Sequence, residues 1–124
     1  MSRDCQAVDG NMNLLNFAEE YLLRTGRRCF TVLQNGRELG LATVDDLKHI
    51  ARNRWTFMTI ADIAHPLNQM PSVSPETPMA QALDLMARRE LTHLPVISNG
   101  ELVGVISRSD VVQLMQTRQE LKAA

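Results

Sequence analysis

The sequence predicts an α/β fold of the α+β kind, built from two copies of one strand-helix-strand-strand-helix unit. Two Asn-Gly turns, Asn35-Gly36 and Asn99-Gly100, lie 64 positions apart, each between apolar runs. Asn-Gly in this setting is the strongest short-range signal for a β-hairpin. Three more positions recur at the same spacing: Gly40, Thr43 and Asp46 in the first copy, and Gly104, Ser107 and Asp110 in the second. A repeat at fixed spacing therefore organises the chain.

The first copy contains an amphipathic helix, because the apolar residues from Leu14 onward follow the i, i+3, i+4, i+7 spacing of one helix face. Asn11 or Asn13 is the expected N-cap, and Gly26 is the expected end of this helix. Residues 1–7 are polar and are expected to be loosely held. The elements expected next are strands at 29–33 and 38–42 and a helix from Thr43 to near Arg52.

The second copy is reached through a connector at residues 53–72, in which residues 59–63 are expected to form a short extended piece. Four prolines between Pro66 and Pro78 disfavour helix before the next element. A helix is expected to start near Pro78, where proline is tolerated. The second hairpin follows, and then a last helix that fades into the polar tail 116–124.

Each copy has about 60 residues, which is near the lower limit for a domain that buries its own core. The two copies, 1–58 and 59–124, are therefore expected to pack face to face, with pseudo-two-fold symmetry, in one globule.

The composition excludes several classes of protein. The formal net charge is −1 and the basic residues are scattered, so no nucleic-acid partner is expected. The chain contains no apolar run of the length that a membrane span needs. Its two cysteines, Cys5 and Cys29, give no disulfide framework, so Cys29 is interpreted as a structural thiol and a reducing compartment is expected.

Both copies carry longer matching motifs. The second contains His93-Leu94-Pro95-Val96-Ile97 and then Gly104-Val105-Ile106-Ser107-Arg108-Ser109-Asp110. The first contains Phe30-Thr31-Val32-Leu33 and Gly40-Leu41-Ala42-Thr43-Val44-Asp45-Asp46. In these motifs, and over nearly its whole length, the chain resembles a tandem pair of CBS domains, the Bateman module.

A narrower resemblance rests on Val8-Asp9-Gly10-Asn11, on residues 21–28 and on Trp55. These stretches are similar to the CBS pair attached to membrane zinc metallopeptidases of the site-2-protease type. The protease motif H-E-x-x-H is absent from the sequence, and its three histidines lack metal-ligand spacing. The chain is therefore expected to be a non-catalytic regulatory piece of such a protease.

The resemblance implies that an adenine nucleotide (AMP, ADP or ATP) binds as a regulatory ligand in the cleft between the copies, with no cofactor required. Asp46 and Asp110 would accept hydrogen bonds from the ribose hydroxyls, with the hydroxyls of Thr43 and Ser107 beside them. The residues expected near phosphate are Arg28, His93, Arg108 and Thr77, and the expected adenine walls are Val73, Ile63 and Pro95 in one cleft and Val8 and Phe30 in the other.

The first copy departs from the family pattern. Met12 stands where the second copy has Thr77, and Thr31 stands where it has Pro95. Because the Thr77 hydroxyl has no counterpart at Met12, the Asp110 cleft ranks above the Asp46 cleft.

Simpler interpretations stay open for the same residues. Thr43 with Asp46, and Ser107 with Asp110, match the capping-box pattern, which stabilises the start of a helix without any ligand. His93, where the family often has arginine, is either a surface histidine or a weaker, pH-sensitive phosphate contact. Arg28 is either a phosphate ligand or, with Arg27, a solvated basic pair.

Two functions therefore remain open from the sequence. One is a regulatory sensor that controls an attached or partner protein such as a membrane metalloprotease. The other is an interaction module whose clefts are empty. Either is compatible with a homodimer formed through the helices, and with a cytoplasmic location or the cytosolic part of a membrane protein.

Overall fold

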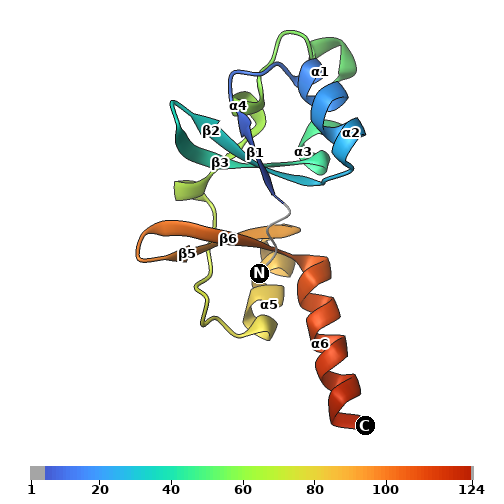
Figure 1. Ribbon diagram of the computed structural model, residues 1–124, viewed down its shortest axis with the longest axis vertical. Helices are drawn as coiled ribbons and strands as arrows, with labels where there is room; N and C mark the ends of the chain where they lie inside the picture. The colour runs from blue at the N-terminus through green and yellow to red at the C-terminus, as the bar shows by residue number, and fades with distance from the viewer. Residues whose placement is uncertain (1–4, 124) are drawn as a thin grey trace. The chain divides into compact units, whose positions relative to one another are not determined.

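The computed structural model describes residues 5–123, which fall into two compact units (Figure 1). The first unit ends at Gln69 and the second begins at Met70. Each unit contains a β-hairpin with helices attached to it, and the mixed helix and strand content is that of an α+β fold.

The first unit contains a four-stranded sheet in the order β1-β2-β3-β4, in which β1 is parallel to β2 and the other pairs are antiparallel. The strands are β1 (Gln6–Asp9), β2 (Cys29–Gln34), β3 (Arg37–Thr43) and β4 (His65–Pro66). The helical segments are α1 (Leu14–Phe17), η1 (Ala18–Leu22), α2 (Leu23–Thr25), α3 (Val44–Lys48), η2 (Arg52–Arg54), α4 (Ile60–Ile63) and η3 (Leu67–Gln69). From β1 to α3, this order confirms the predicted strand-helix-strand-strand-helix unit.

The first helical stretch, α1–η1–α2, is continuous and has a π-helical turn in its middle. Its start is capped by Asn13, whose Oδ1 accepts a hydrogen bond of 2.8 Å from the backbone N–H of Asn16. It ends at Gly26, whose φ of 67° is left-handed. Both ends confirm the prediction.

The second unit contains α5 (Met79–Arg89), β5 (His93–Ser98), β6 (Glu101–Ser107) and α6 (Arg108–Ala123). A short parallel bridge takes the place of an opening strand. The Val73 N–H donates to the Pro95 carbonyl at 3.1 Å, and the Ile97 N–H donates to the Val73 carbonyl at 2.8 Å. Helix α5 begins directly after Pro78, as predicted.

The two hairpins are built alike. Asn35 and Gly36 have φ angles of 53° and 76°, and Asn99 and Gly100 have φ angles of 53° and 78°. Positive φ at both turn residues is the geometry that the twist of paired strands favours. Each hairpin also shifts its register at the same place, between Val32 and Leu33 or between Val96 and Ile97. The repeat predicted from the Asn-Gly spacing is confirmed in the backbone.

Each unit has its own hydrophobic core. In the first, Phe17, Phe30 and Ile60 have no exposed surface. Phe30 meets the ring of Phe17 edge-on, with 4.8 Å between centroids. In the second, Met86, Leu94 and Val111 are buried together. Aliphatic side chains and methionine supply most of this second core, as expected for a chain poor in aromatic residues.

Four expectations about element bounds are wrong, and three of them concern α4, β1 and α6. Residues 60–63 form a helical turn, not an extended piece, and the Thr59 N–H donates to the Asp62 carboxylate at 2.9 Å at its start. Strand β1 already begins at Gln6, within the stretch expected to be loose. Helix α6 continues to Ala123, because Gln, Arg, Glu, Leu and Lys in its last turns are good helix formers and no breaker interrupts them.

Helix α3 is also shorter than predicted, ending at Lys48 instead of near Arg52. The Ile50 N–H closes a tight turn onto the Leu47 carbonyl, and the Ile50 carbonyl accepts a hydrogen bond of 3.0 Å from the indole N–H of Trp55. The indole N–H thus supplies the hydrogen bond that a backbone N–H of a further helical turn would have donated to the Ile50 carbonyl.

The compact units divide eleven residues later than the predicted repeat boundary at 58/59. The reason lies in α4 and β4. Ile60 is fully buried in the first core, and β4 pairs with β3. The repeat in the sequence predicts where the second copy begins. The boundary of a compact unit depends instead on which segments pack into its hydrophobic core.

The two cysteines are joined to each other, so the expectation of a structural thiol at Cys29 is wrong. Gln6 pairs with Phe30 in the parallel register of β1 and β2, which places the preceding residues, Cys5 and Cys29, side by side. Their Cα atoms are 4.7 Å apart, which suits a disulfide. With the thiols paired, the cysteine content no longer favours a reducing compartment.

Replacing Gly40 with alanine should cost about 1–3 kcal/mol of stability. A Cβ at this position would overlap the carbonyl oxygen of His65 and lie 2.7 Å from its carbonyl carbon, so β4 would have to move. Urea unfolding followed by fluorescence of Trp55, the one tryptophan of the chain, reports on this unit. Gly36→Asn is the control, since Asn tolerates positive φ and no atom lies within 4 Å of a Cβ there. Equal stability of Gly40→Ala and wild type would contradict the crowding.

Candidate functional site

The Asp46 carboxylate of the first unit is held by its own helix start. Its Oδ2 accepts hydrogen bonds from the Thr43 backbone N–H at 2.8 Å and from the Thr43 hydroxyl at 3.1 Å. The Asp46 N–H donates in return to the Thr43 hydroxyl oxygen at 3.4 Å. The capping box predicted from the spacing is therefore complete at α3.

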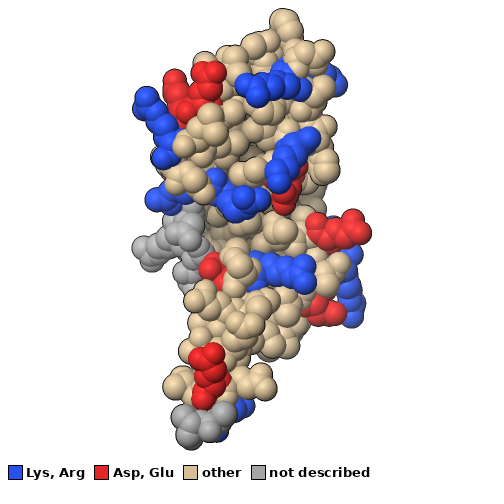
Figure 2. All heavy atoms as spheres, turned by 90° about the vertical axis from the view of Figure 1, so that its right-hand side faces the viewer, with Lys and Arg blue, Asp and Glu red and all other residues tan. Residues whose placement is uncertain are grey.

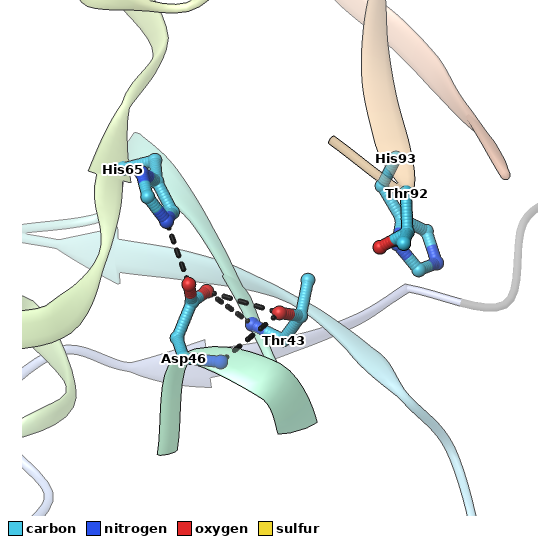
Figure 3. A network of polar contacts seen from close by, with 5 residues as sticks. All are labelled: Thr43, Asp46, His65, Thr92 and His93. Carbon is cyan, nitrogen blue, oxygen red and sulfur yellow. Dashed lines mark hydrogen bonds and ion pairs between the residues drawn. The ribbon is translucent and has the colours of Figure 1, made fainter. Parts of the chain in front are cut away.

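The other oxygen of Asp46 is engaged by a residue that the sequence did not single out. His65 Nε2 lies 2.6 Å from Asp46 Oδ1, and Figure 3 shows His65 and Thr43 on different sides of this carboxylate. The Asp46 side chain is 17% exposed and that of His65 is 48% exposed. A carboxylate accepts about four hydrogen bonds. Three of these positions on Asp46 are already used within the first unit.

The Asp110 carboxylate of the second unit is in a different state. The Asp110 N–H donates to the Ser107 hydroxyl at 3.1 Å, which caps α6. The expected capping box is therefore only half formed. The Ser107 hydroxyl caps the helix, but the Asp110 carboxylate accepts no hydrogen bond from the Ser107 backbone N–H. Asp110 Oδ2 is buried and accepts no hydrogen bond from the residues that the structure describes. A buried carboxylate oxygen without a donor is unfavourable and rare in folded proteins.

The residues expected near phosphate differ in exposure. Arg28 and Arg108 are exposed, directly before β2 and at the first position of α6. His93 is partly buried, and its Nδ1 lies 2.9 Å from the Thr92 hydroxyl. Figure 3 shows the two residues beside each other. The Thr77 hydroxyl accepts a hydrogen bond of 3.0 Å from the Ser74 N–H in the turn before α5.

The expected adenine walls are mostly core residues. Val8 and Phe30 are 3% and 0% exposed within the first core, which leaves them little surface for a ligand. Pro95 and Val73 are likewise buried, where Val73 bridges to β5. Ile63 is partly buried and belongs to the first unit. Its grouping with Val73 and Pro95 stays a prediction.

The described residues on the face drawn in Figure 2 form no extended patch of one charge sign. On the face drawn in Figure 2, Lys and Arg side chains are interspersed with Asp and Glu. Within residues 5–123, no cluster of three or more His, Cys, Asp or Glu residues could hold a metal ion. Nor does any helix in this range have the length and apolarity needed to cross a lipid bilayer.

Comparisons with known proteins agree with this architecture. Residues 60–117 match the CBS domain family. A protein of Synechocystis sp. named as a zinc metalloprotease is 25% identical over 89% of this chain, and Rip3 of Mycobacterium tuberculosis, named likewise, is 26% identical over 93%. The chain spans only about 30% of the length of these relatives.

Solved structures share the fold over most of the chain. A CBS-domain containing protein from Agrobacterium tumefaciens superposes with a TM-score of 0.77 at 22% identity, covering 92% of this chain and 91% of that one. The CBS domain pair of protein MJ0100, in complex with 5-methylthioadenosine and S-adenosyl-L-methionine, gives 0.75 at 18% identity, covering 95% and 93%.

A third structure is the CBS domain of a bacterial CNNM/CorC family Mg²⁺ transporter in complex with ATP. It gives a TM-score of 0.72 at 18% identity and covers 91% of this chain and 81% of its own. The duplicated hairpin and the fold similarity over both repeats lead to one conclusion: the chain has the fold of a pair of CBS domains, and residues 60–117 match the CBS domain family itself.

Proposed function

We propose that this chain is a regulatory module that binds an adenine nucleotide at Asp110 of its second unit and thereby controls an attached or partner zinc metalloprotease. The observation that carries the proposal is the buried Oδ2 of Asp110, which has no donor within the described residues. A ligand hydroxyl directed at this atom would satisfy it.

The chemistry around Asp110 suits a nucleotide. A ribose presents two adjacent hydroxyls, and a free carboxylate can accept a hydrogen bond from each. Asp110 lies in the first turn of α6, a helix of 16 residues, whose N-terminal dipole favours phosphate nearby. Arg108 and His93 are the side chains that we assign to phosphate oxygens, with Thr77 as a further hydroxyl.

The class of ligand is supported by two of the fold neighbours, which were solved with ATP or with adenosyl compounds bound. The regulated partner is suggested by the relatives named as zinc metalloproteases. This chain lacks the H-E-x-x-H motif, so its part in such a protein is non-catalytic. Nucleotide would act through a difference in its affinity for two states of the module.

Saturating nucleotide should raise the melting temperature, and Asp110→Ala should abolish this shift. At a ligand concentration 100 times Kd, binding contributes about 2.7 kcal/mol, or about 5–10 °C for a chain of this size. Loss of two hydrogen bonds to a charged acceptor should weaken binding at least about 100-fold. The measurement is thermal shift with ATP, ADP, AMP and S-adenosylmethionine.

The variant should remain as stable as wild type, to within about 1 kcal/mol, without ligand. The reason is that the cap of α6 uses the backbone N–H of residue 110, which alanine keeps. Asp84→Ala is the matched control, because Asp84 is an exposed aspartate of the same unit that pairs only with Arg88 across one helical turn. It should keep the full shift. A shift that survives in Asp110→Ala would remove Asp110 from the site.

The competing function, a module for self-association, has its own support in the helices. In the first unit, α1, η1 and α3 enclose an apolar groove of about 240 Å³ that includes Leu15, Leu22, Leu47 and Trp55. In the second, Met79 and Met115 line a groove of about 480 Å³ between α5 and α6. If no adenosyl compound shifts the melting temperature at millimolar concentration, packing of a second copy on these grooves becomes the favoured function.

A further inference from the structure

The strongest asymmetry between the two units lies at their corresponding aspartates. Asp46 and Asp110 occupy the same position of the repeat, yet three hydrogen bonds reach the Asp46 carboxylate while none from the described residues reaches Asp110 Oδ2. The spacing of Thr43 to Asp46 equals that of Ser107 to Asp110, so it does not explain the difference. Two of the three bonds come from Thr43 and complete the capping box, and the third comes from His65, which lies outside the helix start.

The position of His65 is fixed by backbone pairing in the sheet. It lies in β4, where Leu41 pairs with His65 and Gly40 pairs with Pro66. The close approach of β4 depends on Gly40, since any side chain there would overlap the His65 backbone. A two-residue strand thus presents the imidazole to the one oxygen of Asp46 that the helix cap leaves available.

We propose that His65 is an internal substitute for a ligand hydroxyl on Asp46, so that the first site is closed and the chain binds one nucleotide instead of two. This inference rests on the proposed function, because it assumes that Asp110 accepts a ribose. A ribose needs two acceptor positions, and Asp46 keeps about one of its four. To bind, a nucleotide would have to displace a hydrogen bond of 2.6 Å from a ring nitrogen.

Two further features of the first unit favour its closure. Met12, which stands at the Thr77 position, is partly buried against the first core and offers no hydroxyl. Thr31, at the Pro95 position, is 8% exposed within β2. Removing His65 alone should therefore restore a site weaker than the one at Asp110, and millimolar nucleotide is needed to detect it.

The test is the number of ATP molecules bound per chain at saturation, measured by equilibrium dialysis on the full chain. Wild type should bind one ATP, His65→Ala should bind two, and His65→Ala combined with Asp110→Ala should return to one. His49→Ala is the matched control, because His49 is an exposed histidine of the same unit at the end of α3. It should leave the value at one. Circular dichroism confirms that each variant is folded.

The outcomes separate this inference from the proposed function. One ATP bound by both wild type and His65→Ala would overturn the role of His65 and leave the nucleotide site at Asp110 intact. Two bound by wild type would overturn it as well. No binding by any variant would overturn both. Binding by His65→Ala alone would support the closure at Asp46 and contradict the site at Asp110.

Discussion

Phe30→Ala should lower the free energy of unfolding of the first unit by about 3–5 kcal/mol, the largest effect expected of a single substitution in this chain. Phe30 has no exposed surface, and its ring meets Phe17 and Tyr21 edge-on at 4.8 and 6.2 Å between centroids. Alanine would leave a cavity at the centre of the sheet and remove both aromatic contacts. In urea unfolding followed by Trp55 fluorescence, the midpoint should fall by at least about 1 M.

The matched control is Phe57→Ala, since the Phe57 side chain is 86% exposed. This change should alter stability by no more than about 0.5 kcal/mol. The pair also tests the two roles considered for Phe30. If Phe30 were a wall of an adenine site and not a core residue, the Phe30→Ala chain would unfold at the wild-type midpoint, and the core assignment would fail.

Reduction of the Cys5–Cys29 disulfide should destabilise the first unit by about 3 kcal/mol. The bond closes a loop with a sequence separation of 24, and a cross-link of this span removes a corresponding amount of entropy from the unfolded chain. It also fixes β1, an edge strand of four residues that pairs only with β2. The measurement is urea unfolding with and without dithiothreitol.

The double variant Cys5→Ser, Cys29→Ser is the control for this experiment. It should unfold like the reduced wild type and should not respond to dithiothreitol. Mass spectrometry after alkylation provides the independent check, because two labels should attach only after reduction. Labelling of both thiols in unreduced, folded protein would show that the cysteines are not joined.

The features predicted correctly from the sequence are those set by neighbouring residues. An Asn-Gly pair specifies a tight turn wherever it lies between strand-forming residues, so both hairpins follow from it. The two ends of the first helix are similarly local. Asn13 caps its start with a side-chain hydrogen bond, and Gly26 ends it with a positive φ. The short helix at 60–63 was expected to be extended. It could have been predicted in the same way, because Thr59 and Asp62 have the spacing of a helix start.

The missed features that bear on the site depend on pairings between distant residues. The Cys5–Cys29 bond requires the parallel register of β1 and β2, which no local pattern specifies. The His65–Asp46 contact spans 19 positions and depends on a strand of two residues. The different use of Asp46 and Asp110 was equally hidden, because the two helix starts have the same residue spacing.

The contribution of α4 and β4 to the first unit determines how this chain can be dissected. Ile60 supplies a fully buried side chain, and its N–H donates to the Met12 carbonyl, while the Ala61 N–H donates to the Gly10 carbonyl. A fragment truncated at residue 58 would lose all of these contacts. It would also lose β4, which pairs with β3 on the side opposite β2. A fragment of the first unit should therefore end at Gln69, because it then keeps all four strands of its sheet.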